Sequence, residues 1–191
     1  KYNDSDGNPS LKYNLDLGPL GAEGKITGVV LDSSGDVFVA GTSSNSALSD
    51  TVVNSHSGAL DAFIIKVDDQ TSTASEQFVS YSGTSADDAG SAIAIDLTDN
   101  GIYVAGHTDG LFSDETRSAS TDGFLTKFSS TGAKQYDHQF GSAYENRSLG
   151  ITLDLNGTSI LSMIGVPNGS VPPDDSNVLV ARTSVRADQS F

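Results

Sequence analysis

Residues 92–108 read "AIAIDLTDNGIYVAGHT": an apolar run ending in Asp, a polar turn containing Gly, and a second apolar run followed by Gly, His and Thr. Residues 28–43, "GVVLDSSGDVFVAGTS", and residues 150–166, "GITLDLNGTSILSMIGV", keep the same order of features. The Asp that ends the first run stands at positions 32, 96 and 154, at intervals of 64 and 58 residues. An internal repeat of this length is the first guide to the fold class.

Two further sets of segments keep the same period. One set comprises residues 61–69, 122–130 and 177–185, and the other comprises runs that end at Gly18, Gly83 and Gly141. These segments are short, rich in Val, Ile, Phe and Tyr, and bounded by Gly, Asp, Asn and Ser, which indicates β-strands. Ser-Gly and Asn-Gly pairs between the first two strands supply tight hairpin turns. We therefore expect four strands in each repeat.

Several of these strands read as near-continuous apolar runs, which indicates that both faces of each sheet are buried. A four-stranded antiparallel sheet, covered on both faces and repeated about every 60 residues, predicts an all-β fold built of β-propeller blades. A stacked β-solenoid is the main alternative. Its coils are usually shorter and do not alternate tight turns with long connections so regularly.

The chain resembles the bacterial β-propeller repeats known as SBBP repeats in three segments: "DAFIIKVDD" (61–69), "FVSYSGTSADDAGSAIAIDLTDNGIYVAGHT" (78–108) and "DGFLTKFSSTG" (122–132). The resemblance covers most of the chain and is best over residues 61–132. It departs after Arg147, where "SMIGVPNGSVPPDD" (162–175) replaces a Gly-x-Thr turn. The resemblance implies a propeller, and it transfers no catalytic residue.

The period divides the chain, a single β-propeller segment over 1–191, into blades. Residues 1–18 correspond to the end of a preceding blade, 25–83 and 89–141 to two blades, and 147–191 to an incomplete blade. Propellers close with about 4 to 8 blades, and about three are present here. We expect a partial propeller from a longer repeat protein, or a strand over residues 11–17 that completes a blade in a ring, including a ring of two chains. Open edges and an exposed blade face predict dimerisation or aggregation.

Composition limits the partners. The 10 Lys and Arg against 25 Asp and Glu give a net charge of −15, which argues against nucleic acid and anionic membrane surfaces. No apolar run approaches the ~20 residues of a membrane helix. With no cysteine, disulfides and thiolate chemistry are excluded. The acidic, Ser-, Thr- and Gly-rich composition favours an extracellular or cell-surface bacterial protein.

A candidate metal site lies near the start of the sequence. Residues 3–8, "NDSDGN", place the oxygens of Asp4, Asp6 and Asn8 at alternate positions, which partly matches a calcium loop. The Glu at the twelfth position of such a loop is absent. An Asx-rich hairpin turn uses the same residues and is the interpretation we favour. Apart from calcium, the sequence implies no cofactor.

Acidic residues also recur where one repeat passes into the next: Glu23, Asp87, Asp88 and Glu145. They could form a ring of carboxylates near a central channel and bind cations. We favour solvated loops, or caps on backbone amides, as the explanation. If they converged on one cleft, an enzyme would become the better interpretation.

Basic residues give no catalytic signal. The three histidines, His56, His107 and His138, occupy non-equivalent places in the repeat, which argues against a zinc or catalytic cluster. Three cations do recur at the end of the third strand, namely Lys66, Lys127 and Arg182. We expect them to form salt bridges with carboxylates of a neighbouring blade. No nucleophile motif occurs, and no residue is predicted to be catalytic.

The leading functional hypothesis is a non-catalytic binding or scaffolding module of a larger bacterial surface, secreted or appendage-associated protein, which contacts a protein or glycan through its loops. One alternative is a propeller enzyme, a lyase or glycoside hydrolase, that acts on carbohydrate with paired channel carboxylates. Another is a purely structural spacer stabilised by cations.

Overall fold

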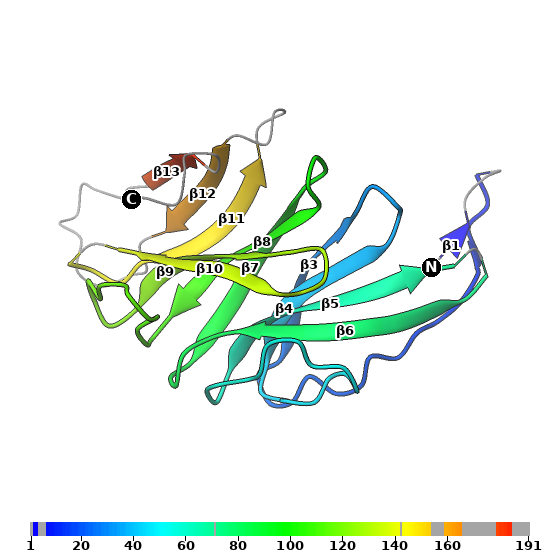
Figure 1. The fold of residues 1–191 in the computed structure, drawn as a ribbon, viewed down its shortest axis with the longest axis horizontal. Coiled ribbons are helices and arrows are strands. Elements are labelled where there is room, and N and C mark those ends of the chain that lie inside the picture. Colours follow the sequence, from blue (N-terminus) through cyan, green and yellow to red (C-terminus); the bar gives the residue numbers. More distant parts are fainter. Residues whose placement is uncertain are drawn as a thin grey trace.

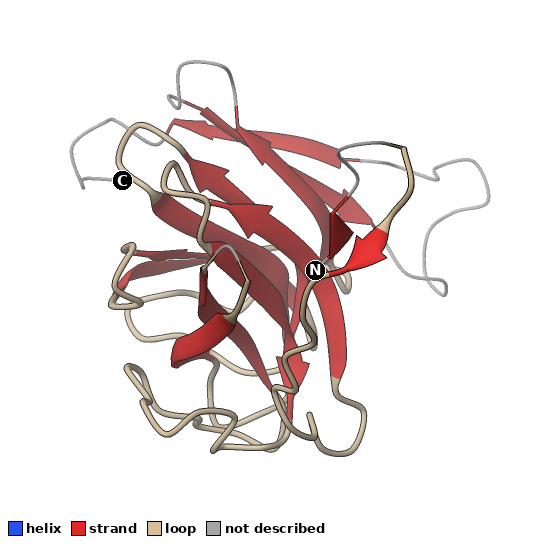
Figure 2. Cartoon of the chain, turned by 90° about the vertical axis from the view of Figure 1, so that its right-hand side faces the viewer, coloured by secondary structure: helices blue, strands red, loops and turns tan. Residues whose placement is uncertain are grey.

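The computed structural model describes residues 2–3, 7–70, 72–141, 143–153, 159–165 and 179–184. Within these ranges the chain forms strands joined by turns and loops, and no helix (Figure 2). In particular, the described part holds no helix of the length and apolar character that crossing a membrane requires. The prediction of an all-β fold is confirmed.

Three sheets follow one another along the chain, and strands adjacent in sequence are adjacent in each sheet (Figure 1). The first contains β3 (Lys25–Leu31), β4 (Val37–Ser43), β5 (Asp61–Asp69) and β6 (Ala74–Ser82). The second contains β7 (Asp88–Asp96), β8 (Gly101–Thr108), β9 (Asp122–Phe128) and β10 (Lys134–Phe140). The third contains, among the described residues, β11 (Arg147–Leu153), β12 (Ser159–Gly165) and β13 (Leu179–Ser184). All neighbouring strands are antiparallel.

The first two sheets confirm the prediction of four-stranded antiparallel units. Their first hairpins are held by the recurring Asp: Oδ1 of Asp32 accepts the Ser34 N–H at 2.8 Å, and Oδ1 of Asp96 accepts the Thr98 N–H at 2.8 Å. Gly35 and Asn100 take positive φ values of 90° and 53° in these turns. The sheets lie in sequence order and do not close into a ring within the described residues (Figure 1).

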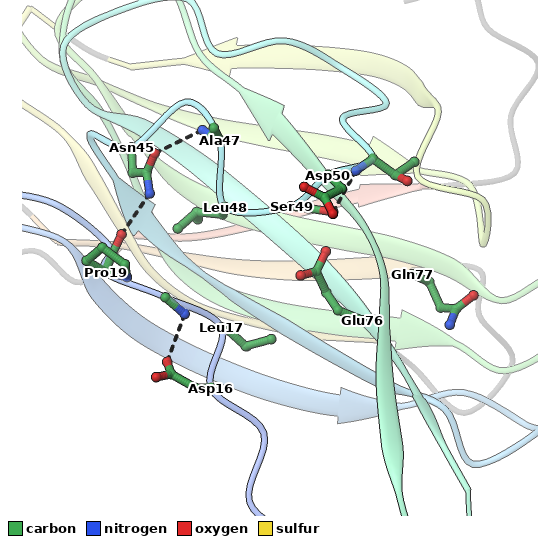
Figure 3. Close-up of a pocket in the computed structure, with 12 residues that line it drawn as sticks. Asp16, Leu17, Pro19, Asn45, Ala47, Leu48, Ser49, Asp50, Glu76 and Gln77 are labelled. Carbon is green, nitrogen blue, oxygen red and sulfur yellow. Dashed lines mark hydrogen bonds between the residues drawn. The ribbon is translucent and has the colours of Figure 1, made fainter.

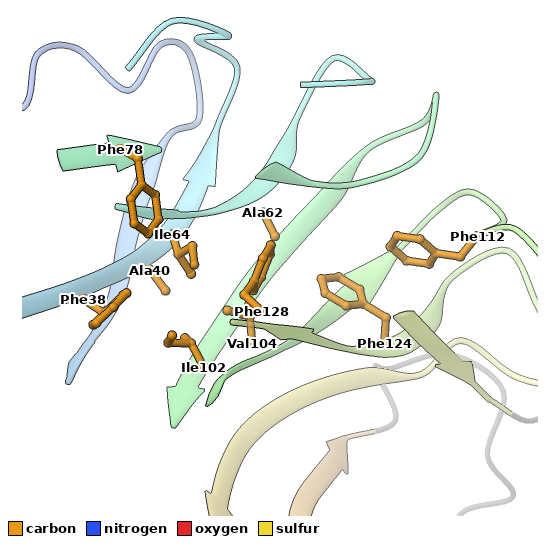
Figure 4. Packing of buried hydrophobic residues seen from close by; sticks show 10 residues of the cluster. All are labelled: Phe38, Ala40, Ala62, Ile64, Phe78, Ile102, Val104, Phe112, Phe124 and Phe128. Atoms are coloured by element: carbon orange, nitrogen blue, oxygen red, sulfur yellow. The ribbon is translucent and has the colours of Figure 1, made fainter. Parts of the chain in front are cut away.

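The first and second sheets pack face to face through a cluster of aliphatic and aromatic side chains (Figure 4). Phe38 and Ile64 contribute from the first sheet, and Val104 and Phe124 from the second. Ile93 of β7 packs against the same cluster. The first strand of the second sheet therefore lies on the face of the first sheet.

Alternate residues of one strand belong to different clusters, as expected for a sheet buried on both faces. In β5, Ile64 faces the second sheet, whereas Phe63 and Ile65 belong to a cluster on the opposite face. In β8, Val104 faces the first sheet, whereas Tyr103 packs with residues of the third sheet. The second sheet therefore has one face toward the first sheet and the other toward the third.

The expected strand over residues 11–17 is wrong for most of its length. Only β2 (Ser10–Leu11) is a strand, and it pairs with β1 (Tyr2–Asn3) in a separate hairpin. Residues 12–20 instead run across the first sheet, where Leu15 and Leu17 pack against the cluster of Phe63. The physical reason is that none of the described strands forms a ladder with residues 12–17, so apolar burial decides their path.

The recurring cations pair within their own sheet, so the prediction of salt bridges to a neighbouring blade is wrong. Lys66 Nζ lies 3.0 Å from Asp36 Oδ2 and 3.5 Å from Asp32 Oδ2, and 5.3 Å from the centroid of the Phe38 ring. In the second sheet, Lys127 Nζ forms the equivalent ion pair, 3.1 Å from Asp99 Oδ2. In each sheet the lysine side chain passes over an aromatic ring of the second strand, Phe38 in β4 or Tyr103 in β8. Its ammonium group thereby reaches the turn between the first two strands of the same sheet. The side chain of Arg182 lies outside the described residues.

Candidate functional site

In each of the first two sheets, a long loop leads into the third strand, and an Asp at the start of that strand holds the loop. Asp61, the first residue of β5, accepts the N–H groups of Ser57 at 2.6 Å and Gly58 at 3.1 Å. Asp122, the first residue of β9, accepts the N–H groups of Ser118 at 2.7 Å and Ala119 at 3.1 Å, which lie at the same spacing. Both aspartates are buried. The recurrence of Asp at positions 61 and 122 was a signal for this role, which the sequence reasoning missed.

Asp88, one of the predicted acidic loop residues, is buried at the start of β7. Its Oδ2 accepts the N–H of Thr84 at 2.6 Å and the hydroxyl of Thr84 at 2.9 Å. Its Oδ1 has no hydrogen bond of good geometry from the described residues. Burial raises the pKa of Asp88 to about 6, against the opposing effect of the Thr108 and Thr84 hydrogen-bond donors, and the charge of Asp61 adds to the rise.

Asp61 and Asp88 meet at Gly83. A Cβ on Gly83 would collide with Oδ1 of Asp61 and would lie 3.0 Å from Oδ2 of Asp88. Burial raises the pKa of Asp61 as well. His56 lies beside this pair: its Nδ1 is 3.7 Å from Oδ2 of Asp61, and its Nε2 donates to the carbonyl oxygen of Ser43 at 3.0 Å. Two carboxyl groups of neighbouring sheets thus share one buried site.

The other predicted acids do not join this pair. Glu23, Asp87 and Glu145 are exposed, and each precedes the first strand of a different sheet. Glu145 accepts the hydroxyl of Ser120 at 2.8 Å. The described ranges hold no group of three or more His, Asp or Glu residues that could bind a metal ion. The carboxylate ring stays a prediction.

The predicted calcium ligands are only partly visible. Asp4 and Asp6 lie outside the described residues. Asn8 is exposed in the turn between β1 and β2. The calcium loop and the plain hairpin turn therefore both stay predictions.

The histidines have separate surroundings. His107 lies 2.7 Å from Arg147 Nη1 through its Nε2, and its pKa is lowered to about 4, first by burial and then by the charge of Arg147. His138 lies 3.1 Å from Oε1 of Glu115 through its Nδ1. His56 belongs to the Asp61 site.

A polar pocket of about 450 Å³ opens between the N-terminal segment, the loop after β4 and the start of β6 (Figure 3). We call it the acidic pocket. Its lining comprises Asp16, Leu17, Gly18, Pro19, Asn45, Ala47, Leu48, Ser49, Asp50, Thr51, Glu76 and Gln77. Three carboxylates from three separate segments surround it, and the lining contains no Lys or Arg.

Hydrogen bonds fix the wall of the acidic pocket. The side-chain amide of Asn45 donates to the carbonyl of Pro19 at 2.9 Å, and its Oδ1 accepts the Ala47 N–H at 3.0 Å. The hydroxyl of Tyr81 donates to the carbonyl of Asn45 at 2.6 Å and accepts the Leu48 N–H at 3.2 Å. A buried tyrosine of β6 thus holds the loop, and Asn45 joins the loop to the N-terminal segment.

Comparison with known proteins agrees with the sheet pattern. Residues 77–113 match the family model SBBP, described as a beta-propeller repeat, and this match covers most of β6, all of β7 and β8, and the connections between them. The chain is also similar to Regulatory protein FlaEY of Caulobacter vibrioides, with 25% identity over 179 residues. The similarity covers 92% of this chain and 18% of that relative. The chain thus spans less than a fifth of the length of that relative.

Proposed function

Because residues 77–113 are a β-propeller repeat of the SBBP family, we propose that the chain is a non-catalytic binding module made of stacked blades. The partner we propose is a basic segment of another protein, bound at the acidic pocket. The observation that carries this proposal is the set of three carboxylates, Asp16, Asp50 and Glu76, around a pocket whose lining has no cation of its own.

Electrostatics support a cationic partner. Carboxylates that converge on a concave surface attract ammonium and guanidinium groups, and the net charge of −15 would steer such a partner toward the module. Leu17 and Leu48 add apolar surface against which the stem of a Lys or Arg side chain can pack. The loop is fixed by Tyr81 and Asn45, so less ordering entropy is lost on binding.

An enzyme acting on carbohydrate is less well supported by the same geometry. A hydrolase of this kind uses a carboxyl group with a raised pKa that reaches the substrate. Asp61 and Asp88 have raised pKa values, but both are buried and neither lines the acidic pocket.

For the architecture, we propose that the segments 25–83 and 89–141 are blades, that 147–191 is an incomplete blade and that 1–18 belongs to a preceding blade. Together they would form part of a propeller in a larger extracellular or cell-surface bacterial protein. The relative from Caulobacter is named a regulatory protein, and that name describes no chemical reaction. A module that acts by contacts is compatible with such a name.

The test measures peptide binding by fluorescence anisotropy. We expect an Arg-rich peptide to bind and a Glu-rich peptide of the same length not to bind. Asp50→Asn combined with Glu76→Gln should weaken binding about tenfold, equivalent to ~1.4 kcal/mol. Asp87→Asn is the matched control, because Asp87 is exposed and lies outside the acidic pocket. Equal losses in control and pocket variants, or binding of a neutral oligosaccharide but no Arg-rich peptide, would overturn the proposal.

A further inference from the structure

The outer edge of β6 already accepts the backbone of another segment along part of its length. β6 is the last strand of the first sheet and pairs with β5 on its inner side. On its outer side, the Val79 N–H donates to the carbonyl of Thr51 at 2.9 Å, and the Val53 N–H donates to the carbonyl of Val79 at 2.9 Å. Residues 51–53 run parallel to β6 through a bridge between Val52 and Val79. The loop after β4 thus acts as a short added strand.

The first half of β6, residues 74–77, has no such cover among the described residues. These residues are half-buried or exposed, whereas residues 78–82 are buried. Of the backbone hydrogen bonds that lie outside the strand ladders in the described part of the chain, none involves residues 74–77. The carbonyl of Ser75 accepts the side-chain amide of Gln77 at 3.4 Å, so a donor outside the ladder can reach it. We call residues 74–77 the open edge.

The open edge lies between two pockets. The first is the acidic pocket, which Glu76 and Gln77 line. The second has a volume of about 360 Å³, and its lining comprises Asp36, Thr51, Val53, Lys66, Asp68, Gln77, Phe78, Ser130 and Thr131. We call it the mixed pocket, because it holds both carboxylates and a lysine. Thr51 and Gln77 line both pockets, and in Figure 3 the side chains of Glu76 and Gln77 point away from each other.

This arrangement suits an extended peptide whose side chains alternate in character. Consecutive side chains of a β-strand point to opposite faces of the sheet. A strand added to the open edge would therefore direct every second side chain to the acidic pocket and the others to the mixed pocket. Cationic side chains in the first set would meet Asp16, Asp50 and Glu76. Polar side chains in the second set would meet the hydroxyl groups of Ser130 and Thr131.

We propose that the basic segment binds as an added β-strand along the open edge of β6, with a cation at every second residue. The inference rests on the basic partner proposed above, and it adds the binding mode and the spacing of the cations. In this mode, backbone hydrogen bonds supply affinity and the pockets on either side supply specificity. The loop at Val79 shows that the outer side of β6 can form such bonds.

The first test uses a hexapeptide, Arg-Thr-Arg-Thr-Arg-Thr with blocked ends, in fluorescence anisotropy. The matched control, Arg-Arg-Arg-Thr-Thr-Thr, has the same charge and composition, and we expect it to bind about tenfold more weakly because its cations do not share one face. Equal affinity of the two peptides would overturn the alternating contact. If neither peptide binds, the proposed function fails together with this inference.

Backbone methylation of the hexapeptide tests the added strand itself. One version carries N-methyl groups on its arginines and the other on its threonines, so that each removes the N–H donors on one side of the strand. One version should lose about tenfold in affinity, because it loses backbone hydrogen bonds to β6, and the other should bind nearly as the parent does. The direction of the added strand decides which version is sensitive. Equal affinities of the two versions would overturn strand addition, while binding of the parent peptide would leave the proposed function standing.

Amide hydrogen exchange locates the contact on the protein. With the hexapeptide at about ten times its Kd, amides of the open edge that donate to the peptide should exchange about tenfold more slowly. Residues 134–137 of β10 are the internal control, because β10 is the outer strand of the second sheet. Binding without slower exchange in residues 74–77, or with equal slowing in residues 134–137, would contradict the proposed mode.

Discussion

Asp61 and Asp88 place carboxylate oxygens beside the same glycine, Gly83, although they begin strands of different sheets. Neither forms an ion pair with Lys or Arg in the described part of the chain. Two buried carboxyl groups this close are costly when both are charged, and burial raises the pKa of each of them. This relationship makes the junction between the first two sheets sensitive to pH.

Asp88→Asn should become more stable than the wild type as the pH rises. The pKa of Asp88 is about 6 in the folded chain, compared with 3.8 for an aspartate that the fold does not perturb. The folded state therefore holds the proton more tightly than the unfolded state. The contribution of this group to stability is therefore present below about pH 4 and lost between about pH 4 and pH 6. The variant should gain on the order of 2–3 kcal/mol relative to the wild type between about pH 3 and pH 8. Urea unfolding across this range measures the difference.

The third sheet offers a natural precedent for this substitution. Asn146 donates its N–H to the carbonyl of Thr121 at 2.8 Å, as Asp88 does to the carbonyl of Leu60 at 2.8 Å. At the junction between the second and third sheets, an asparagine therefore already occupies the position that Asp88 occupies between the first and second sheets. Asp87→Asn serves as the control, because its side chain is exposed. A constant difference between Asp88→Asn and the wild type at all pH values would contradict the prediction.

The titration of His107 should change the stability of the fold with pH in the direction opposite to that of Asp88. Its pKa is lowered from 6.5 to about 4, first by burial and then by Arg147, so the folded state disfavours the charged ring. The wild type should therefore lose stability relative to His107→Gln as the pH falls from about 6.5 to about 4, by up to ~3 kcal/mol. An NMR titration should show His107 neutral at about pH 5.5. A midpoint near 6.5 would refute the shift.

These two groups titrate in overlapping ranges with opposite effects on stability. The wild-type stability curve can therefore look nearly flat between about pH 4 and pH 6, while each variant shows a slope. The comparison of the two variants, and not the wild-type curve, is the informative measurement.

The repeat made most of the strands predictable. Runs such as residues 92–108 show both apolar strands and their turn, since strand length, turn residues and burial on two faces are all local properties. Residues 12–17 were mispredicted for a tertiary reason. They have the composition of a strand, but a strand also needs a neighbour to pair with, and the described chain offers none.

The candidate site was much less predictable. Asp16, Asp50 and Glu76 come from three segments, and although Asp50 recurs 64 residues later as Asp114, the repeat does not reveal that these three surround one pocket. The burial of Asp88 beside its exposed neighbour Asp87 depends on which of the two pairs with Thr108 at the start of a strand. Periodic patterns predict packing, and non-repeated loop contacts need the structure.

Gly83→Ala should destabilise the chain, because the new Cβ would collide with Oδ1 of Asp61 and approach Asp88. The cost should be about 1–3 kcal/mol, the usual range for forcing atoms into a packed site. Gly150→Ala is the matched control, because nothing lies within 4 Å of its Cβ position. Thermal unfolding should show a clear loss for the first variant only. Equal melting temperatures would mean that the junction can open to accept a methyl group.

Lys66→Met should cost more than Lys127→Met, although both residues occupy the same place in the repeat. Lys66 lies near Asp32, whose side chain is 4% exposed, whereas the partner of Lys127, Asp99, is 52% exposed. Without Lys66 a buried carboxylate loses its countercharge, which costs about 3 kcal/mol, while an exposed pair contributes less than about 1 kcal/mol. In both variants the methionine side chain still packs against the aromatic ring beside it, Phe38 in the first sheet and Tyr103 in the second. Urea unfolding at neutral pH should therefore separate them, and equal losses would show that burial of Asp32 does not govern the strength of the pair.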